Sequence, residues 1–130
     1  MIHRLTAWGP AAAWAAVLFF LSAIPDTGLP SLRVNDKLIH VVLYLIWGGT
    51  LAWGRLRNRG RPGSIVLLGL GILYAAGDEI HQAFVPGRDP SLGDLGADAV
   101  GLILGYGLTI AFLRRAGWGS FTGAGPFPEA

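Results

Sequence analysis

The sequence contains no cysteine and few charged residues, and both absences narrow the class of protein. Without cysteine, the chain can form neither a disulfide nor a thiolate metal site. Charged residues make up 14% of the sequence against 52% hydrophobic residues, which lies outside the usual balance of a water-soluble domain. The apolar residues also come in four long blocks, without the dispersed periodic pattern that a water-facing surface requires. The sequence therefore predicts an integral membrane protein.

A basic recognition helix is also missing, so the positive charge does not indicate a nucleic-acid-binding protein. The formal net charge is +2, but the excess comes from arginines at the ends of the apolar blocks. Positive charge in these positions indicates how a chain is oriented in a membrane. We therefore expect the lipid bilayer as a partner and no nucleic acid.

The four apolar blocks predict an all-α fold, an integral membrane four-helix bundle. A helix needs about 20 predominantly apolar residues to cross the hydrocarbon core, and proline and glycine at the junctions mark where helices end. The expected spans are residues 6–24, 37–54, 64–84 and 94–113. They form one domain over residues 1–116, followed by a flexible tail over residues 117–130 that is rich in glycine and proline.

The first block has an alternative interpretation as a cleaved signal peptide. Arg4 precedes its apolar run, and Ser22 and Ala23 provide small residues near its end. The run is longer than the apolar part of a typical signal peptide, and its removal would leave three spans. We therefore favour a first membrane span.

The lysines and arginines are shared unequally between the two sides of the predicted bundle. Seven lie on one side: Arg4, Arg55, Arg57, Arg59, Arg61, Arg114 and Arg115. Three lie on the other: Arg33, Lys37 and Arg88. Because short cytoplasmic loops are enriched in basic residues, we predict that both termini are cytoplasmic and that loops 25–36 and 85–94 face outward. The tryptophans Trp8, Trp47, Trp53 and Trp118 include residues near span ends, where such rings favour the headgroup layer.

Three of the predicted helices carry polar residues at helical spacing. The stripes are Asp36, His40 and Tyr44; Tyr74, Asp78 and Gln82; and Asp94 and Asp98, continued by the small residues Gly101 and Gly105. An acid in the middle of a membrane costs roughly 2.5 to 3.5 kcal/mol, so these stripes should face one another inside the bundle. Lys37 and Arg88 are available to pair with the acids. The pattern predicts a wet polar pocket that opens outward.

Two segments resemble the VanZ-like membrane proteins: DKLIHVVLY (36–44) and DEIHQAFVPGRDPSLGDLGADAVGLILG (78–105). The family pattern carries over to Asp36, Lys37, His40, Tyr44, Asp78, Glu79, Gln82, Pro86, Gly87, Arg88, Asp94, Gly101 and Gly105. Asp98 departs from it, because the family commonly has asparagine there. The resemblance implies a bacterial multi-pass protein of the cytoplasmic membrane, associated with the cell envelope. Namesakes of the family lower susceptibility to glycopeptides such as teicoplanin, but the resemblance supplies no mechanism.

The residues above define a candidate binding site and two hypotheses for its use. The candidate residues are Asp36, Lys37, His40, Tyr44, Asp78, Glu79, Gln82, Arg88, Asp94 and Asp98. The leading hypothesis is an accessory envelope protein whose pocket binds a polar or anionic head group, of a lipid-linked envelope precursor or of an amphiphile such as a lipoglycopeptide. The competing hypothesis is a membrane enzyme acting on lipid-linked head groups, with Asp78 or Glu79 as base and His40 as proton shuttle. It ranks second because no nucleophile with an activating base is visible.

Several of these residues also have purely structural interpretations. His40 could be hydrogen-bonded within the bundle to Asp36, and Arg88 could form a packing ion pair with Asp94 or Glu79. A proton-coupled carrier is disfavoured because the inner half of the bundle is almost wholly apolar. No compact metal-ligand motif is present, so we expect neither a metal nor a cofactor. The sequence leaves the oligomeric state open.

Overall fold

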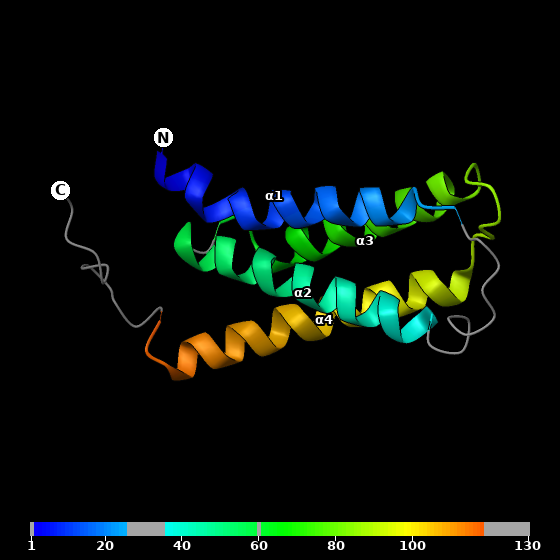
Figure 1. The fold of residues 1–130 in the computed structure, drawn as a ribbon. Coiled ribbons are helices and arrows are strands. Elements are labelled where there is room, and N and C mark those ends of the chain that lie inside the picture. The colour runs from blue at the N-terminus through cyan, green and yellow to red at the C-terminus, as the bar shows by residue number, and fades with distance from the viewer. Residues whose placement is uncertain (1, 26–35, 60, 119–130) are drawn as a thin grey trace.

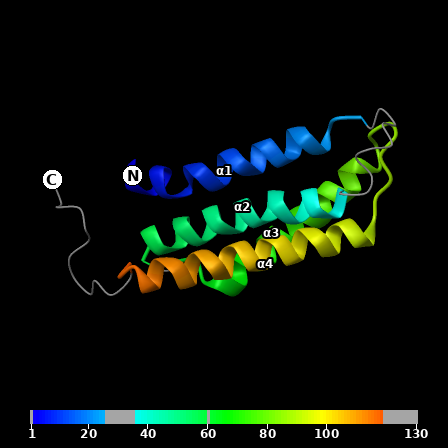
Figure 2. The ribbon, with the colours of Figure 1, turned by 60° about the horizontal axis from the view of Figure 1, so that its bottom comes forward.

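The computed structural model describes residues 2–25, 36–59 and 61–118, and within them the chain forms four α-helices and no strand. The helices are α1 (Ile2–Ser22), α2 (Asp36–Arg57), α3 (Ser64–Gln82) and α4 (Leu92–Arg115). They run along a common axis in one bundle, with the start of α1 and the end of α4 at the same end (Figures 1 and 2). The all-α four-helix prediction is confirmed. The predicted flexible tail over residues 117–130 lies outside the described residues from residue 119 onward.

The helix bounds differ from the expected spans by a few residues, for local reasons. The predicted third span ended at residue 84, but α3 ends at Gln82 and a turn follows, closed by the bond from the Val85 N–H to the Gln82 carbonyl at 3.0 Å. The fourth helix begins two residues before its predicted start, because Ser91 caps it by accepting a hydrogen bond from the Gly93 N–H. Its last turn includes Arg114 and Arg115, whose charge favours a helix C-terminus.

The outer surface of the bundle is suited to lipid. Among the described residues, α2, α3 and α4 are each long and apolar enough to cross a membrane, while α1 contributes a shorter apolar stretch, Thr6–Ser22. Large apolar side chains point away from the core on all four helices, including Phe20, Leu38, Ile65, Leu73 and Phe112. A water-soluble bundle would bury such residues. The fold therefore supports a membrane protein.

The pair α2 and α4 shares the most extensive contact of any two helices in the described part of the bundle, and glycines allow their backbones to approach closely. A Cβ atom on Gly101 would collide with the carbonyl oxygen of Val41, and one on Gly105 with that of Leu45. Gly48 of α2 meets the backbone of α4 in the same way. The predicted close approach along Gly101 and Gly105 is confirmed, and it fixes the distance between the polar stripes of α2 and α4.

Three aromatic side chains join α1 to the rest of the bundle through backbone carbonyls. The Trp14 indole N–H donates to the Leu43 carbonyl at 2.9 Å, and the Trp47 indole N–H donates to the Ala11 carbonyl at 3.0 Å. The Tyr74 hydroxyl donates to the Ala15 carbonyl at 2.6 Å. Trp47 is buried at the centre of α2 and therefore belongs to the core, away from the headgroup layer where its ring type is often found.

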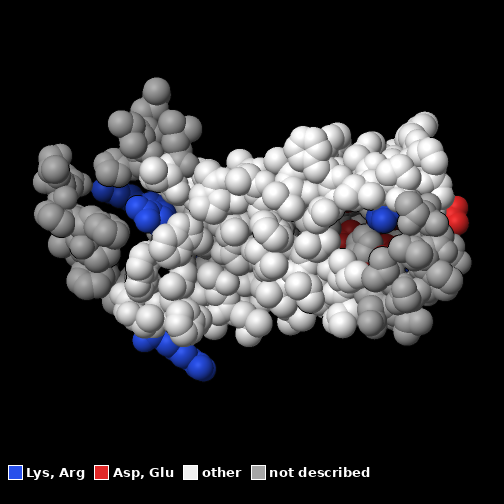
Figure 3. Space-filling model, viewed as in Figure 1, with Lys and Arg blue, Asp and Glu red and all other residues white. Residues whose placement is uncertain are grey.

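Charged side chains gather at the two ends of the bundle and leave the middle apolar. Basic side chains lie at the end that holds the start of α1 and the end of α4, whereas acidic side chains are seen at the opposite end (Figure 3). The second end is where α1 and α3 finish and α2 and α4 begin. The candidate site residues lie at this second end.

Candidate functional site

The polar stripes of α2, α3 and α4 meet inside the bundle at its acidic end. His40 of α2, Asp78, Glu79 and Gln82 of α3, and Asp94 and Asp98 of α4 are all buried. Asp98 is almost completely buried, although it is a carboxylate on a helix that is apolar enough to span a membrane. The convergence predicted from helical spacing is thus found, whereas the use of these residues for binding stays a prediction.

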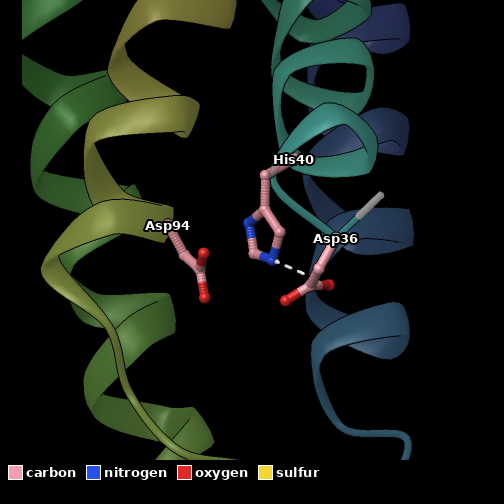
Figure 4. A group of neighbouring side chains, drawn as sticks. All are labelled: Asp36, His40 and Asp94. Atoms are coloured by element: carbon pink, nitrogen blue, oxygen red, sulfur yellow. Dashed lines mark ion pairs between the residues drawn. The ribbon is translucent and has the colours of Figure 1, made fainter. Parts of the chain in front are cut away.

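His40 is held between carboxylates from two helices. Its Nδ1 atom lies 2.8 Å from Asp98 Oδ1, within hydrogen-bonding distance, while its Nε2 atom lies 3.9 Å from Asp36 Oδ1. Figure 4 shows the imidazole between the side chains of Asp36 and Asp94. The sequence interpretation placed Asp36 as its hydrogen-bond partner, but the short contact is made by Asp98. A carboxylate in this position fixes the orientation of the ring.

The two described cations of this end differ in their contacts. Lys37 Nζ lies 3.0 Å from Asp94 Oδ1 and forms an ion pair with it. Arg88 is half-buried and makes no ion pair within the described part of the chain. The suggested packing pair with Asp94 or Glu79 is therefore not formed. Glu79 instead accepts a hydrogen bond from the Ser91 N–H to Oε2 at 2.9 Å, which ties α3 to the start of α4.

Ser22 also lies at this end of the bundle, although the sequence interpretation considered it only as a small residue. It is buried, and its hydroxyl lies 3.1 Å from His81 Nδ1. The His81 ring stacks on Phe19 with 4.9 Å between ring centroids. These contacts join α1 to α3 beside Asp78. The sequence signal that could have identified Ser22 as a contact residue is its single hydroxyl at the end of a long apolar run.

A cavity of about 640 Å³ opens beside these residues. Its polar lining comes from Asp36, His40, Tyr44, Asp78, Gln82, Arg88, Asp89 and Asp94. Its apolar lining comes from Leu18, Leu21, Ile24, Ile39 and Leu43. Acidic side-chain atoms are visible within a hollow at this end of the molecule (Figure 3). The lining thus combines charged and apolar side chains, which is the combination that an amphiphile requires.

A second hollow of about 590 Å³ lies between α2 and α4 nearer the arginine-rich end. It is lined by apolar residues, glycine and two threonines, and includes Ile46, Trp53, Leu108 and Phe112. Among the described residues, no ionisable side chain lines it. Because it has no group that could recognise a charged ligand or transfer a proton, we assign the candidate site to the polar cavity.

Three buried oxygen atoms near the polar cavity have no hydrogen-bond partner among the described residues: Tyr44 OH, Glu79 Oε1 and Asp98 Oδ2. Buried polar atoms are nearly always paired, so each of these is available to a further group. Metal-capable atoms also come together in two sets, Asp36–His40–Asp94 and His40–Glu79–Asp98, in each of which the atoms lie within 4.8 Å of one another. No linear motif could have revealed the second set, because its members come from three helices.

A family model described as VanZ/LLP1 matches residues 7–114, which is most of the chain and includes both segments that carry the resemblance. No curated protein and no solved structure matches the sequence.

Proposed function

The chain belongs to the VanZ/LLP1 family, and from this membership we propose that it is a multi-pass protein of the bacterial cytoplasmic membrane whose polar cavity binds the head group of an anionic amphiphile. The observation that carries the proposal is the cavity of about 640 Å³ that is lined by both charged and apolar side chains. A volume in this range accommodates a small ligand or a head group.

Arg88 is the residue expected to recognise the ligand. It lines the cavity and makes no ion pair in the described part of the chain, so its guanidinium is available. Guanidinium binds phosphate and carboxylate through two parallel hydrogen bonds. The acids of the same lining, including Asp78 and Asp94, would accept hydrogen bonds from hydroxyl or amine groups. The ligand would therefore combine an anion with hydrogen-bond donors.

The apolar lining limits the ligand to molecules that also carry a hydrocarbon chain. Leu21 of α1, Ile24 just after it and Ile39 of α2 line the cavity, and the outer faces of these helices are apolar. A lipid-linked envelope precursor meets both requirements, since it joins a phosphate-bearing head group to a polyprenyl chain. A lipoglycopeptide such as teicoplanin meets them in part, through its carboxylate and acyl chain. Binding of either could alter glycopeptide susceptibility.

A membrane enzyme acting on the same head groups is the second candidate. The observation that favours it is the His40–Asp98 contact of 2.8 Å, because a carboxylate-oriented imidazole is suited to act as a general base. Glu79 presents a further oxygen with no partner among the described residues. Such a site would activate a hydroxyl group or a water molecule at the bound head group.

Binding by the purified protein tests the leading proposal. A fluorescent lipid-linked envelope precursor and teicoplanin would be titrated separately in detergent micelles, and the affinity measured by polarisation. Arg88→Gln is expected to weaken binding about tenfold or more, because a hydrogen bond to a charged group contributes about 1.5 to 3 kcal/mol. Arg115→Gln removes an exposed arginine at the opposite end of α4 and should leave the affinity unchanged.

The same samples distinguish the two candidate functions. Mass spectrometry of the incubated precursor would follow product formation. Saturable binding without product supports the accessory role, whereas turnover that is lost in Glu79→Gln supports the enzyme. Equal affinity of the wild type and Arg88→Gln for both probes would contradict the assigned binding mode.

A further inference from the structure

We propose that His40, Glu79 and Asp98 form a binding site for one divalent transition-metal ion, of which Zn²⁺ is the test case, between α2, α3 and α4. Each residue offers one ligand atom, and these atoms lie within 4.8 Å of one another. All three side chains are buried. Imidazole nitrogen and carboxylate oxygen are both zinc ligands, and a zinc site with three protein ligands keeps a further position open.

The unpaired oxygens of the two acids point to an added ligand. Glu79 is oriented by the Ser91 N–H, which donates to Oε2, while Oε1 is buried without a partner in the described residues. Asp98 contacts His40 through Oδ1, while Oδ2 is likewise buried without a partner there. Each carboxylate is thus fixed by one oxygen and has the other available. Hydrogen bonds of this kind orient the ligands of established metal sites.

Charge balance also favours an ion at this position. Neither Glu79 nor Asp98 forms an ion pair with lysine or arginine in the parts of the chain that are described. A protonated His40, 2.8 Å from Asp98, would balance one of the two buried charges, and the other must be neutralised by a proton or by an added cation. A divalent ion compensates both at once.

The alternative set, Asp36–His40–Asp94, is less suitable for a cation. The ammonium group of Lys37 already lies 3.0 Å from Asp94 Oδ1 and would repel a second positive charge. Asp36 is half-exposed, with 49% of its side-chain surface accessible, and an exposed carboxylate is well solvated without an ion. His40 belongs to both sets and also lines the polar cavity. The inner set is therefore the metal site, and its open position is expected on the cavity side.

The three residues lie toward the helix ends beside the polar cavity, which His40 lines. His40 is four residues from the start of α2, Glu79 is three residues from the end of α3, and Asp98 is six residues from the start of α4. At about 1.5 Å per residue, these positions are about 4 to 9 Å from the helix ends. The mixed nitrogen and oxygen ligands favour a transition metal over Mg²⁺ or Ca²⁺, which prefer oxygen alone.

Metal binding by the full chain tests the proposal. Protein purified in detergent and treated with a chelator would be titrated with Zn²⁺ by calorimetry, and bound metal would be counted by mass spectrometry after desalting. We expect one ion per chain. Glu79→Gln and Asp98→Asn should each weaken binding by at least about tenfold, since even residues that merely orient ligands contribute that much. Asp78→Asn is the matched control, because it removes the neighbouring buried acid of the same helix and should retain the ion.

Each outcome decides the proposal. If the wild-type protein binds no stoichiometric Zn²⁺, the proposed metal site is overturned. This result needs no variant and therefore does not depend on whether a variant folds. Undiminished binding by Glu79→Gln and Asp98→Asn, or equal loss in Asp78→Asn, overturns the assigned ligands. Loss in Asp36→Asn with retention in Glu79→Gln would assign the ion to the outer set instead. Because the titration contains no head-group ligand, its failure leaves the Arg88 proposal standing, and failure of that proposal leaves this one standing.

Discussion

Tyr44 and Tyr74 both lie in the core region of the bundle, but only one of their hydroxyls is paired in the described structure. The Tyr74 hydroxyl donates to the Ala15 carbonyl at 2.6 Å, whereas the hydroxyl of Tyr44, a residue only 2% exposed, has no partner there. Tyr74→Phe should lower the free energy of unfolding by about 0.5 to 1.5 kcal/mol, the range of hydrogen bonds between membrane helices. Tyr44→Phe should leave it unchanged or raise it, because a buried unpaired hydroxyl is unfavourable.

Unfolding in detergent micelles by increasing sodium dodecyl sulfate, followed by tryptophan fluorescence, measures both variants. Each variant keeps its ring, so the lost area is the same and the comparison isolates the hydroxyl. An equal loss of stability in Tyr44→Phe and Tyr74→Phe would contradict the assignment of one paired and one unpaired hydroxyl. Metal-free protein is needed here, so that the Tyr44 result reports the chain alone.

At the residue scale, the sequence shows which side chains share a helix face but not which residue they meet on another helix. The four-residue spacing placed Asp36 beside His40, and the two do lie within 3.9 Å. Asp98, which makes the shorter contact with His40, is 58 positions away from it in the chain. Its contact depends on the rotation and register of α4 against α2, which no local pattern specifies. Ser22 was missed as a contact residue for the same reason, since its partner His81 lies on another helix.

The α4 glycines give the clearest prediction at the element scale. A Cβ on Gly105 would collide with the Leu45 carbonyl of α2, whereas one on Gly107 would meet nothing within 4 Å. Gly105→Ala should therefore destabilise the bundle by about 1 to 3 kcal/mol, as overpacking does elsewhere. Gly107→Ala should be neutral or stabilising by up to about 1 kcal/mol, because alanine favours a helix. The sodium dodecyl sulfate assay measures both.

The two alanine variants add the same methyl group to the same helix, two residues apart, and thus differ only in what the methyl meets. A stable Gly105→Ala would mean that α2 and α4 are further apart than described. The result would also weaken the support for the proposed metal ligands, because the His40–Asp98 distance depends on the same helix pair.

At the element scale, apolar length and proline or glycine punctuation placed all four helices to within a few residues. The predicted bounds differ from the structure at the helix ends, where capping residues determine the first and last residue. Ser91 caps α4, so this helix begins earlier than the apolar pattern predicts. Small residues were only partly informative. Gly71 packs against Leu102, but a Cβ on Gly69 would meet nothing within 4 Å. A glycine shows that close packing is possible, and the helix rotation decides whether it occurs.

For the whole molecule, the separation of charge between the ends was foreseeable from the sequence, and the enclosure of the acids was foreseeable from their cost in lipid. The cavity and the groups that form it were not foreseeable in detail. Their geometry depends on how four helices and the turn after α3 come together, including the hydrogen bond from Ser91 to Glu79. The sidedness of the bundle in the membrane stays a prediction, and it determines which ligands can reach the cavity.

Single cysteines test this sidedness directly, because the chain has no cysteine of its own. Asp89→Cys lies by the cavity and Gly63→Cys lies at the arginine-rich end, both at exposed positions, and neither removes a basic residue. With seven basic residues on one side against three on the other, a membrane-impermeant maleimide should label Asp89→Cys on intact cells and Gly63→Cys only after permeabilisation. The reverse pattern would contradict the orientation. The cavity would then open to the cytoplasm, where a lipid-linked precursor could bind before its export but an added glycopeptide could not reach Arg88.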